Sequence, residues 1–298
     1  MGNIDWIAAD WGTSNLRIWA MSGDAVIEAR GSDRGMSAMS GPDDFAAELE
    51  RLTEGWPAVP VVACGMVGAR QGWTEVPYSA VPCTATPALT PVAGDPGGRP
   101  VLIAAGVMQA DPPDVMRGEE TQIAGILAAK PDFDGVICLP GTHTKWARIS
   151  AGEICHFQTV MTGEIFSLLS RQSVLRHSLN GAAGQAGSAA FADAVSTALS
   201  QPHQAWARLF RLRAAGLIGP GDPAEVHARL SGTLIGLDLG AARPYWLGEQ
   251  VLIIGAPYLA ELYSTALQQQ GAAPVVGDAD TTTRAGLLAA WRQYQDPS

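Results

Sequence analysis

The sequence predicts a two-lobed α/β fold, and two stretches of the chain support this prediction. Near the start, three apolar runs joined by short turns read as an antiparallel meander of strands, Ile4–Ala9, Leu16–Met21 and Ala25–Ala29. A helix from Ser40 to about Thr53 and a buried strand at Val59–Cys64 follow. A second strand, polar turn and hairpin occupy Val136–Thr159. We interpret this as an internal repeat of topology, with one polar turn in each lobe.

The length and the remaining elements fit two lobes. The chain has 298 residues and 47% of them are hydrophobic, which is enough for two packed cores. We expect an N-terminal lobe at residues 1–137 and a C-terminal lobe at 138–298, with the last helix packing back on the first lobe. Other expected elements are strands at Val101–Ala105, Val251–Ile254 and Ala273–Gly277, helices at Thr121–Ala129, Tyr258–Gln270 and Thr283–Gln293, a mainly helical Gly163–Ala242 with a loop at Asn180–Ala190, and an irregular Thr84–Gly98.

Composition excludes several classes of function. The formal net charge is −10 and the pI is about 4.9, which argues against binding to a nucleic-acid backbone. The four cysteines lack the spacing of a zinc site or a disulfide framework. No signal peptide and no apolar run of membrane-spanning length is visible. We therefore expect a cytoplasmic protein without nucleic-acid or membrane partners, and leave its oligomeric state open, with a homodimer as one alternative.

The first polar turn lies at Asp10–Arg17, directly after the first strand. Small and hydroxylated residues, Gly12, Thr13, Ser14 and Asn15, offer backbone N–H groups that can surround a phosphate. Asp10 is placed to hold a hydrated Mg²⁺ beside that phosphate. The alternative is an ordinary hairpin turn in which Asp caps its own backbone.

The second polar turn, which follows the strand at Val136–Leu139, repeats this chemistry. It contains Gly141, Thr142 and His143, and Lys145 could neutralise charge on a transferred phosphoryl group. A solvated Lys145 and a structural His143 are the alternatives. A later turn with small residues, Gly255 and Ala256, precedes a helix and leaves room for a flat ring such as adenine, although an ordinary strand-to-helix turn has the same pattern.

Two further segments carry candidate chemistry. Glu119 and Glu120 open a helix after Arg117 and Gly118, and the spacing from Glu119 to Ile123 predicts that Glu119 points to the buried side. One of the two carboxylates could accept a proton or hold a metal, or both could merely complement the helix dipole. The glycine-rich loop Gly65–Trp73 offers a fork for a carboxylate and groups that hydrogen-bond and stack, Arg70, Gln71 and Trp73, or it is a plain surface loop.

Taken together, these motifs resemble the 2-dehydro-3-deoxygalactonokinase family, within the superfamily of two-lobed ATPases that includes actin, hexokinase and Hsp70. The resemblance covers essentially the whole chain. It rests on the segments Ile7–Arg17, Gly65–Trp73, Met116–Gln122, Leu139–Trp146 and Met161–Glu164. The Arg-Gly-Glu-Glu segment is also similar to one in exopolyphosphatases, where a Glu is the catalytic carboxylate.

The resemblance implies an actin-like, ribonuclease H-like fold with an ATP cleft between the lobes. It implies transfer of the ATP γ-phosphoryl group to the 6-hydroxyl of 2-dehydro-3-deoxy-D-galactonate, with ATP and Mg²⁺. Lys145 or Arg17 would then neutralise the γ-phosphoryl group, and Glu119 or Glu120 would be the base. The expected substrate contacts are Arg17, Arg70, Gln71, Trp73, Arg117 and Thr162. The rival interpretations are a polyphosphate or acyl-phosphate phosphotransferase and a non-catalytic, chaperone-like ATP switch.

Overall fold

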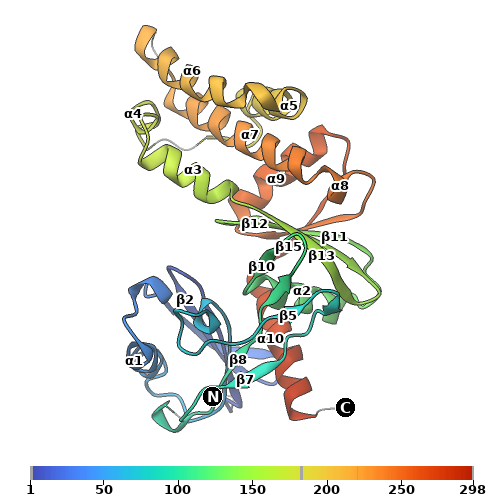
Figure 1. Ribbon diagram of the computed structural model, residues 1–298. Coiled ribbons are helices and arrows are strands. Elements are labelled where there is room, and N and C mark those ends of the chain that lie inside the picture. The colour runs from blue at the N-terminus through green and yellow to red at the C-terminus, as the bar shows by residue number, and fades with distance from the viewer. Residues whose placement is uncertain (1–2, 95, 182–183, 220, 297–298) are drawn as a thin grey trace. The chain divides into compact units, whose positions relative to one another are not determined.

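The computed structural model describes all residues except 1–2, 95, 182–183, 220 and 297–298 (Figure 1). The chain divides into two compact units. Unit 1 comprises residues 1–133, 149–156 and 278–298, and unit 2 comprises residues 134–148 and 157–277. The sequence predicted a single boundary between the lobes, at 137/138. In the structure the chain returns to unit 1 twice, at the hairpin residues 149–156 and at the C-terminal helix, residues 278–298.

Unit 1 is built on a sheet with the strand order β3-β2-β1-β4-β8-β7. β1 pairs antiparallel with β2 and parallel with β4, so the meander and the later buried strands share one sheet. Because β1 is central, its residues from Trp6 to Ala9 are fully covered. The strands are β1 (Trp6–Trp11), β2 (Leu16–Ser22), β3 (Ala25–Ser32), β4 (Val61–Gly65), β7 (Leu89–Pro91) and β8 (Val101–Ala104).

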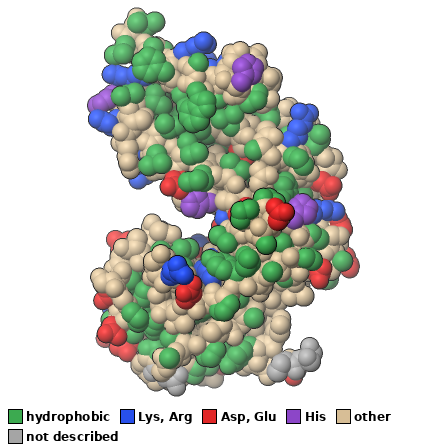
Figure 2. Space-filling model, in the orientation of Figure 1, with side chains coloured by type: hydrophobic (Ala, Val, Ile, Leu, Met, Phe, Trp, Pro, Cys, Tyr) green, Lys and Arg blue, Asp and Glu red, His purple; other side chains and the backbone are tan. Residues whose placement is uncertain are grey.

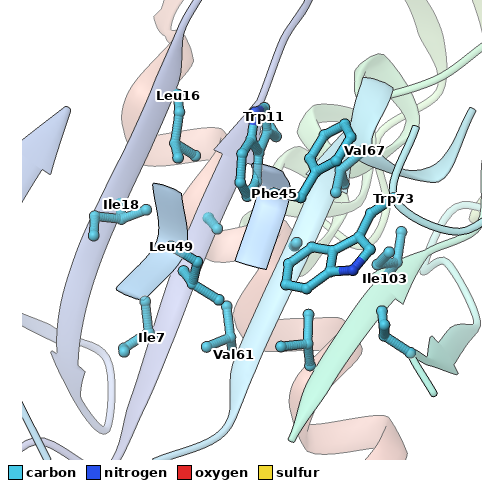
Figure 3. Close-up of a cluster of buried hydrophobic side chains, with 14 of the residues drawn as sticks. Ile7, Trp11, Leu16, Ile18, Phe45, Leu49, Val61, Val67, Trp73 and Ile103 are labelled. Atoms are coloured by element: carbon cyan, nitrogen blue, oxygen red, sulfur yellow. The ribbon is translucent and has the colours of Figure 1, made fainter. Parts of the chain in front are cut away.

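The helices of unit 1 are α1 (Pro42–Leu52), α2 (Glu119–Ala129) and α10 (Ala279–Gln295). Phe45 and Leu49 of α1 pack on the sheet side chains Ile7, Leu16 and Ile18 (Figure 3). Leu287 of α10 belongs to a second cluster, with Trp6, Val62 and Leu102. Short 3-10 turns lie at Met36–Ala38, Met66–Gly68 and Pro96–Gly98, and short strands at β5 (Ser79–Ala80), β6 (Cys83–Thr84), β9 (Val107–Gln109) and β10 (Asp114–Met116).

Two glycines set the distance between α2 and α10. A Cβ atom on Gly125 of α2 would lie 1.9 Å from the Thr282 carbonyl oxygen, and one on Gly286 of α10 would lie 1.8 Å from that of Thr121. Only residues without a Cβ allow the helix backbones to approach this closely. This contact holds the N-terminal half of α10 against the N-terminal half of α2, the helix that begins with the two glutamates.

Unit 2 contains a sheet with the order β15-β14-β11-β12-β13, whose members are β11 (Gly135–Leu139), β12 (Thr144–Ser150), β13 (Glu153–Val160), β14 (Val251–Gly255) and β15 (Val275–Asp278). The start of β13, at Glu153–Ile154, belongs to unit 1 and pairs there with β6. Strand for strand, this order corresponds to β8-β4-β1-β2-β3 of unit 1, and β14 runs parallel to β11 as β4 does to β1. This correspondence agrees with the predicted repeat of topology.

Helices make up the rest of unit 2. They are α3 (Thr162–Arg171), α4 (Arg176–Leu179), α5 (Ala189–Ser200), α6 (Ala205–Ile218), α7 (Pro223–Ala241), α8 (Arg243–Trp246) and α9 (Pro257–Gln269), with a 3-10 turn at Pro202–Gln204. α7 is buried along most of its length. Apolar and basic side chains are exposed over the helical end of this unit in Figure 2. Trp206 and Phe210 of α6 are exposed apolar residues. None of the helices in the described ranges is long and apolar enough to cross a membrane.

Three expectations about elements need correction. The segment Thr84–Gly98 is not wholly irregular, because β7 adds to the sheet edge beside β8. The terminal helix begins at Ala279 rather than Thr283, since Asp278 caps it by accepting the Thr281 N–H at 2.7 Å. In the predicted loop Asn180–Ala190, α5 already begins at Ala189, and residues 182–183 lie outside the described part of the chain.

Candidate active site

The turn between β1 and β2 is a hydrogen-bonded hairpin turn that keeps its hydroxyls exposed. The Gly12 N–H donates to the Asn15 carbonyl over 2.9 Å, and Thr13 and Ser14 are solvent-exposed. Backbone amides of residues 35–37 donate to carbonyls of the turn at 2.9–3.1 Å and hold it from one side. The turn is therefore fixed as a hairpin turn before any ligand binds, although Asp10 pairs with Arg17 and not with its own backbone. Its exposed hydroxyls are compatible with the predicted phosphate contact.

Residues 35–37 were not recognised as part of this turn from the sequence. A Cβ atom on Gly35 would lie 2.4 Å from backbone atoms of Ser14, so the segment needs glycine to approach this closely. The only signal in the sequence is a Gly after a charged stretch, which is typical of many surface turns.

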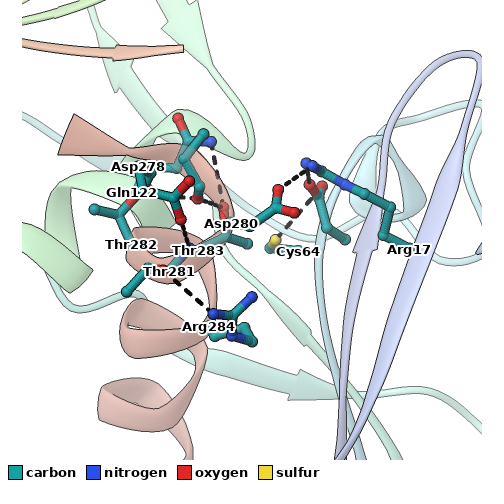
Figure 4. Close-up of polar contacts among 11 residues, drawn as sticks. Arg17, Cys64, Gln122, Asp278, Asp280, Thr281, Thr282, Thr283 and Arg284 are labelled. Atoms are coloured by element: carbon teal, nitrogen blue, oxygen red, sulfur yellow. Dashed lines mark hydrogen bonds and ion pairs between the residues drawn. The ribbon is translucent and has the colours of Figure 1, made fainter. Parts of the chain in front are cut away.

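Asp10 and Arg17 lie side by side because β1 and β2 pair them in register. Arg17 Nη2 is 2.5 Å from Asp10 Oδ2, and Nη1 of the same guanidinium contacts Asp280 Oδ1 at the start of α10 (Figure 4). Burial acts to lower the pKa of Arg17, but the Asp10 and Asp280 carboxylates outweigh it and raise that pKa. Asp280 is a member of the site that sequence reasoning missed.

The end of β4 brings Asp10 close to the acidic start of α2. Cys64 Sγ lies 3.9 Å from Asp10 Oδ1. Burial, then Asp10, then Glu120 raise the pKa of the Cys64 thiol, so both carboxylates lie within electrostatic range of one sulfur atom. A Cβ on Gly118 would lie 3.4 Å from the Gly65 Cα, which places the α2 start against the end of β4. The two acidic groups predicted at separate positions in the sequence therefore meet in unit 1.

Glu120, and not Glu119, is the glutamate on the buried side of α2. Glu120 is fully buried, whereas Glu119 is partly exposed and its Oε2 accepts the Arg117 N–H at 3.1 Å. The spacing to Ile123 misled the prediction because α2 is covered on more than one side, so burial does not follow a single stripe. The expectation that Glu119 points inward is thus wrong.

The Glu120 carboxyl is held by its own helix start. Its Oε2 accepts the Gly118 N–H at 2.7 Å, and its Oε1 accepts the Thr121 hydroxyl at 3.0 Å. Gly118 has φ of 109°, a conformation that favours glycine. Burial first, and the neighbouring Glu119 second, raise the pKa of Glu120 to about 8. Glu120 is therefore mostly protonated at neutral pH in this arrangement.

The glycine-rich loop separates its predicted residues into exposed and buried groups. Arg70 is 80% exposed with Nε 3.7 Å from Glu75 Oε1, and Gln71 is also exposed. Trp73 is only 8% exposed and packs with Trp11 and Phe45 in the core (Figure 3). The expectation that Trp73 stacks on a substrate is therefore replaced by a packing role, because aromatic partners from β1 and α1 cover the ring.

Arg117 lies beneath this loop. Its Nη2 donates to the Val76 carbonyl at 2.7 Å, and its guanidinium lies 4.2 Å from the centre of the Tyr78 ring. Within the described residues, Nε and Nη1 have no hydrogen-bond partner. A Cβ on Gly68 would lie 2.8 Å from Nη1. The structure thus places a buried, incompletely paired cation against the loop predicted to bind the substrate.

In unit 2 the second polar turn packs on the start of α3. The Glu164 N–H donates to the Thr142 carbonyl at 2.9 Å, and His143 Nε2 is 2.5 Å from Glu164 Oε2. Lys145 is 5% exposed, and its Nζ donates to Thr159 Oγ1 at 2.9 Å. The solvated Lys145 considered from the sequence is therefore wrong. Thr162, a predicted substrate contact, instead donates its hydroxyl to Asp238 at 2.5 Å.

Replacing Gly163 with alanine is expected to displace this turn. A Cβ there would lie 2.3 Å from the Gly141 carbonyl oxygen. Because shifts of about 1 Å in a positioning element can reduce catalysis about 100-fold, we expect a loss of 10- to 100-fold in kcat/KM for ATP, measured by steady-state kinetics. Gly187→Ala is the matched control, since a Cβ at Gly187 meets no atom within 4 Å. Equal kinetics of the two variants would contradict the prediction.

A pocket of about 280 Å³ lies next to the second turn within unit 2. Gly141, Thr142, Thr162 and Gly163 form one wall. Apolar and polar side chains from α3, α7 and α9 complete it, including Phe166, Arg171, His227, Leu234, Tyr258 and Leu259. Burial lowers the pKa of His227, so its ring is neutral at pH 7. The pocket is large and apolar enough for a flat heterocycle with a polar edge.

The turn at Gly255 and Ala256, which was predicted to leave room for adenine, is next in sequence to residues that line this pocket. Gly255 ends β14, and Ala256 precedes α9, whose first turn supplies Tyr258 and Leu259 to the pocket wall. A Cβ on Gly255 would lie 2.9 Å from the Pro140 carbonyl oxygen, so this turn also packs against the residue before the second polar turn.

The described residues contain no group of three or more His, Cys, Asp or Glu side chains that could hold a metal ion. The pair of carboxylates at Asp10 and Asp280 suits a cation that takes one or two protein ligands and completes its shell with water and phosphate oxygens, as Mg²⁺ does.

Comparison with known proteins places these features in a family. A family model described as 2-keto-3-deoxy-galactonokinase matches residues 10–290. The chain is 40% identical to a probable 2-dehydro-3-deoxygalactonokinase of Rhizobium meliloti (strain 1021), over 96% of each chain. It is 36% identical to the 2-dehydro-3-deoxygalactonokinase of Escherichia coli (strain K12), over 95% of this chain and 96% of the other.

Solved structures show the same relationship. A crystal structure of a putative 2-dehydro-3-deoxygalactonokinase protein from Sinorhizobium meliloti aligns with a TM-score of 0.91 and 39% identity, over 98% of this chain and 97% of the other. The activator of 2-hydroxyisocaproyl-CoA dehydratase from Clostridium difficile, with bound ADPNP, aligns with a TM-score of 0.53 and 11% identity, over 98% of this chain and 96% of the other, and so shares the fold. Both structures share the fold of this chain, and the chain belongs to the 2-keto-3-deoxy-galactonokinase family.

Proposed function

We infer that this protein is a sugar-acid kinase that transfers the γ-phosphoryl group of ATP to the 6-hydroxyl of 2-dehydro-3-deoxy-D-galactonate. Family membership supports the substrate class. The observation that carries the chemistry is the meeting of Asp10, Arg17, Asp280 and the acidic start of α2 at one edge of the unit 1 sheet. Phosphoryl transfer needs carboxylates and a cation in one place. A passive ATP switch or a polyphosphate phosphotransferase would not need a loop that binds a sugar acid, which is the role predicted for Gly65–Trp73.

We propose that the two polar turns bind the nucleotide phosphates. The exposed hydroxyls and the fixed backbone of Gly12–Ser14 support a phosphate contact in unit 1. In unit 2, Gly141, Thr142 and His143 lie beside the pocket of about 280 Å³. That pocket would take the adenine ring, next to the Gly255–Ala256 turn.

The residues present fit a magnesium ion. Asp10, together with Asp280, would hold Mg²⁺ directly or through water. For this, the Arg17 guanidinium would leave Asp10 and pair with the incoming phosphates. When bound, the ion would neutralise charge on the β- and γ-phosphate oxygens. Arg17 and Lys145 remain the proposed cations for the γ-phosphoryl group.

We propose Glu119 as the group that accepts the proton of the substrate hydroxyl. It is partly exposed, whereas Glu120 is buried and already accepts hydrogen bonds from Gly118 and Thr121. Glu120 would hold the α2 start in place. Arg70 and Gln71 are the exposed groups of the loop that can reach a sugar acid, and Arg117 would support the loop from below or pair with the substrate carboxylate.

Thermal-shift measurements test this proposal. We expect 2-dehydro-3-deoxy-D-galactonate to raise the melting temperature, and a non-hydrolysable ATP analogue to raise it further, because ligands that bind only the native state stabilise it. The gluconate-derived epimer is the matched comparison ligand. Stabilisation by the analogue alone, with no response to either sugar acid, would favour the ATP-switch alternative. A cytoplasmic location and a homodimer stay predictions, and light scattering over a range of concentrations tests the latter.

A further inference from the structure

Asp238 is a fully buried carboxylate in the middle of α7 that accepts three side-chain hydrogen bonds. Trp146 Nε1 donates to Oδ1 at 2.8 Å, and the Thr162 hydroxyl donates to Oδ2 at 2.5 Å. The Tyr263 hydroxyl also contacts Oδ2, and lies 2.9 Å from Thr144 Oγ1. The donors come from β12, α3 and α9, so one carboxylate connects three elements to a fourth.

Two of these elements, β12 and α3, adjoin the second polar turn. Thr144 and Trp146 lie on β12 directly after the turn, on either side of Lys145. Thr162 opens α3, whose next two residues contact the turn through Gly141 and Thr142. Because side chains alternate along a strand, holding Thr144 and Trp146 on one face fixes Lys145 on the other.

A buried carboxyl group is a costly means of joining elements. Burial raises the pKa of Asp238, and the hydrogen bonds from Thr162, Tyr263 and Trp146 oppose that shift. The ion pairs found among the described residues do not include Asp238, so these neutral donors carry its stabilisation. Apolar side chains of similar volume fill such a site at less cost, but they do not fix the direction of their neighbours.

We propose that Asp238 is a positioning residue that fixes the second polar turn and Lys145 in the geometry that binds the ATP phosphates. This rests on the proposed function, because it assumes that the turn contacts nucleotide. The alternative is a role in folding stability alone. A positioning role changes nucleotide binding more than sugar-acid binding, whereas a stability role changes the melting temperature without changing either affinity of the folded protein.

Asp238→Asn tests the proposal, with affinity for a non-hydrolysable ATP analogue measured by calorimetry. We expect about tenfold weaker binding of the analogue and a similar rise in KM for ATP, while KM for the sugar acid changes less than twofold. The matched pair Thr144→Val and Thr233→Val removes one buried hydroxyl each. Thr144 belongs to the hydrogen-bonded group, whereas Thr233 donates to the Arg229 carbonyl in α7 at 2.7 Å, outside it.

If Asp238→Asn does not fold, this pair decides the question. We expect two- to threefold weaker analogue binding for Thr144→Val and no change for Thr233→Val. Analogue affinity equal to wild type in Asp238→Asn, or equal in the two threonine variants, would refute the positioning role and leave the proposed function intact. Absence of analogue binding in the wild-type protein would refute the proposed function and the positioning role with it.

Discussion

Replacing Glu120 with glutamine is expected to raise the free energy of unfolding at pH 7 by about 3 kcal/mol. The pKa of Glu120 is about 8 in the folded protein, against 4.5 as the reference value. Between these values the unfolded chain releases a proton that the folded protein keeps, so the native state loses stability at about 1.4 kcal/mol per pH unit as the pH rises from 4.5 toward 8. Glutamine is neutral in the folded and the unfolded protein, so the variant does not lose stability in this way as the pH rises.

Urea unfolding at pH 5, 6, 7 and 8 measures this effect. The difference between Glu120→Gln and wild type should be small at pH 5 and should grow up to about pH 8, where it levels off. Glu119→Gln is the control, because Glu119 is partly exposed and its neutralisation removes only the smaller of the two causes of the Glu120 shift. A pH-independent difference, or a destabilised Glu120→Gln, would contradict the expectation that Glu120 is neutral in the native protein at pH 7.

Replacing Glu119 with glutamine is expected to lower kcat by a factor of about 10² to 10⁴, the range that a general base contributes. Both KM values should change little, because glutamine keeps the size of the side chain and can still accept the Arg117 N–H. Steady-state kinetics with saturating ATP and sugar acid measure the effect.

The comparison of the two glutamine variants assigns the base. Near-normal kcat in Glu119→Gln together with a large loss in Glu120→Gln would transfer the role to Glu120, whose pKa near neutrality also suits proton transfer. Full activity in both variants would mean that neither carboxylate accepts the proton.

Local patterns in the sequence were sufficient to predict most of the sheet. The apolar runs of β1, β2, β3, β4 and β14 are long enough to show their type, and their ends were placed within a few residues. The two- and three-residue strands β5, β6, β7, β9 and β10 were missed, because so few residues carry no periodicity. Their pairing depends on partner strands that cannot be identified from the local sequence.

The candidate site was predictable where it follows a strand and not where it depends on distant residues. Asp10, Glu119, Glu120 and the two polar turns were identified because polar residues interrupt apolar runs. Asp280 was missed, since it contacts Arg17 from 263 residues further along the chain. A signal for Asp238 did exist: it is the lone charged residue within the otherwise uncharged Leu230–Leu239 run of α7.

The residues that were placed wrongly from the sequence are buried by contacts with other elements. Trp73 follows a glycine-rich loop, but the aromatic rings of Trp11 and Phe45 complete its packing from other elements. The burial of Glu120 depends on the end of β4, because the start of α2 packs there, with a Cβ on Gly118 only 3.4 Å from the Gly65 Cα. Neither covering element is visible from the local spacing.

The release of ADP as a function of sugar acid tests the central claim most directly. With ATP and Mg²⁺ present, we expect ADP release to depend on 2-dehydro-3-deoxy-D-galactonate and to match, one for one, the formation of its 6-phosphate, measured by phosphorus NMR. Glu119→Gln should suppress both together. ADP release that does not respond to the sugar acid, or a product phosphorylated elsewhere than on the 6-hydroxyl, would contradict the proposed function.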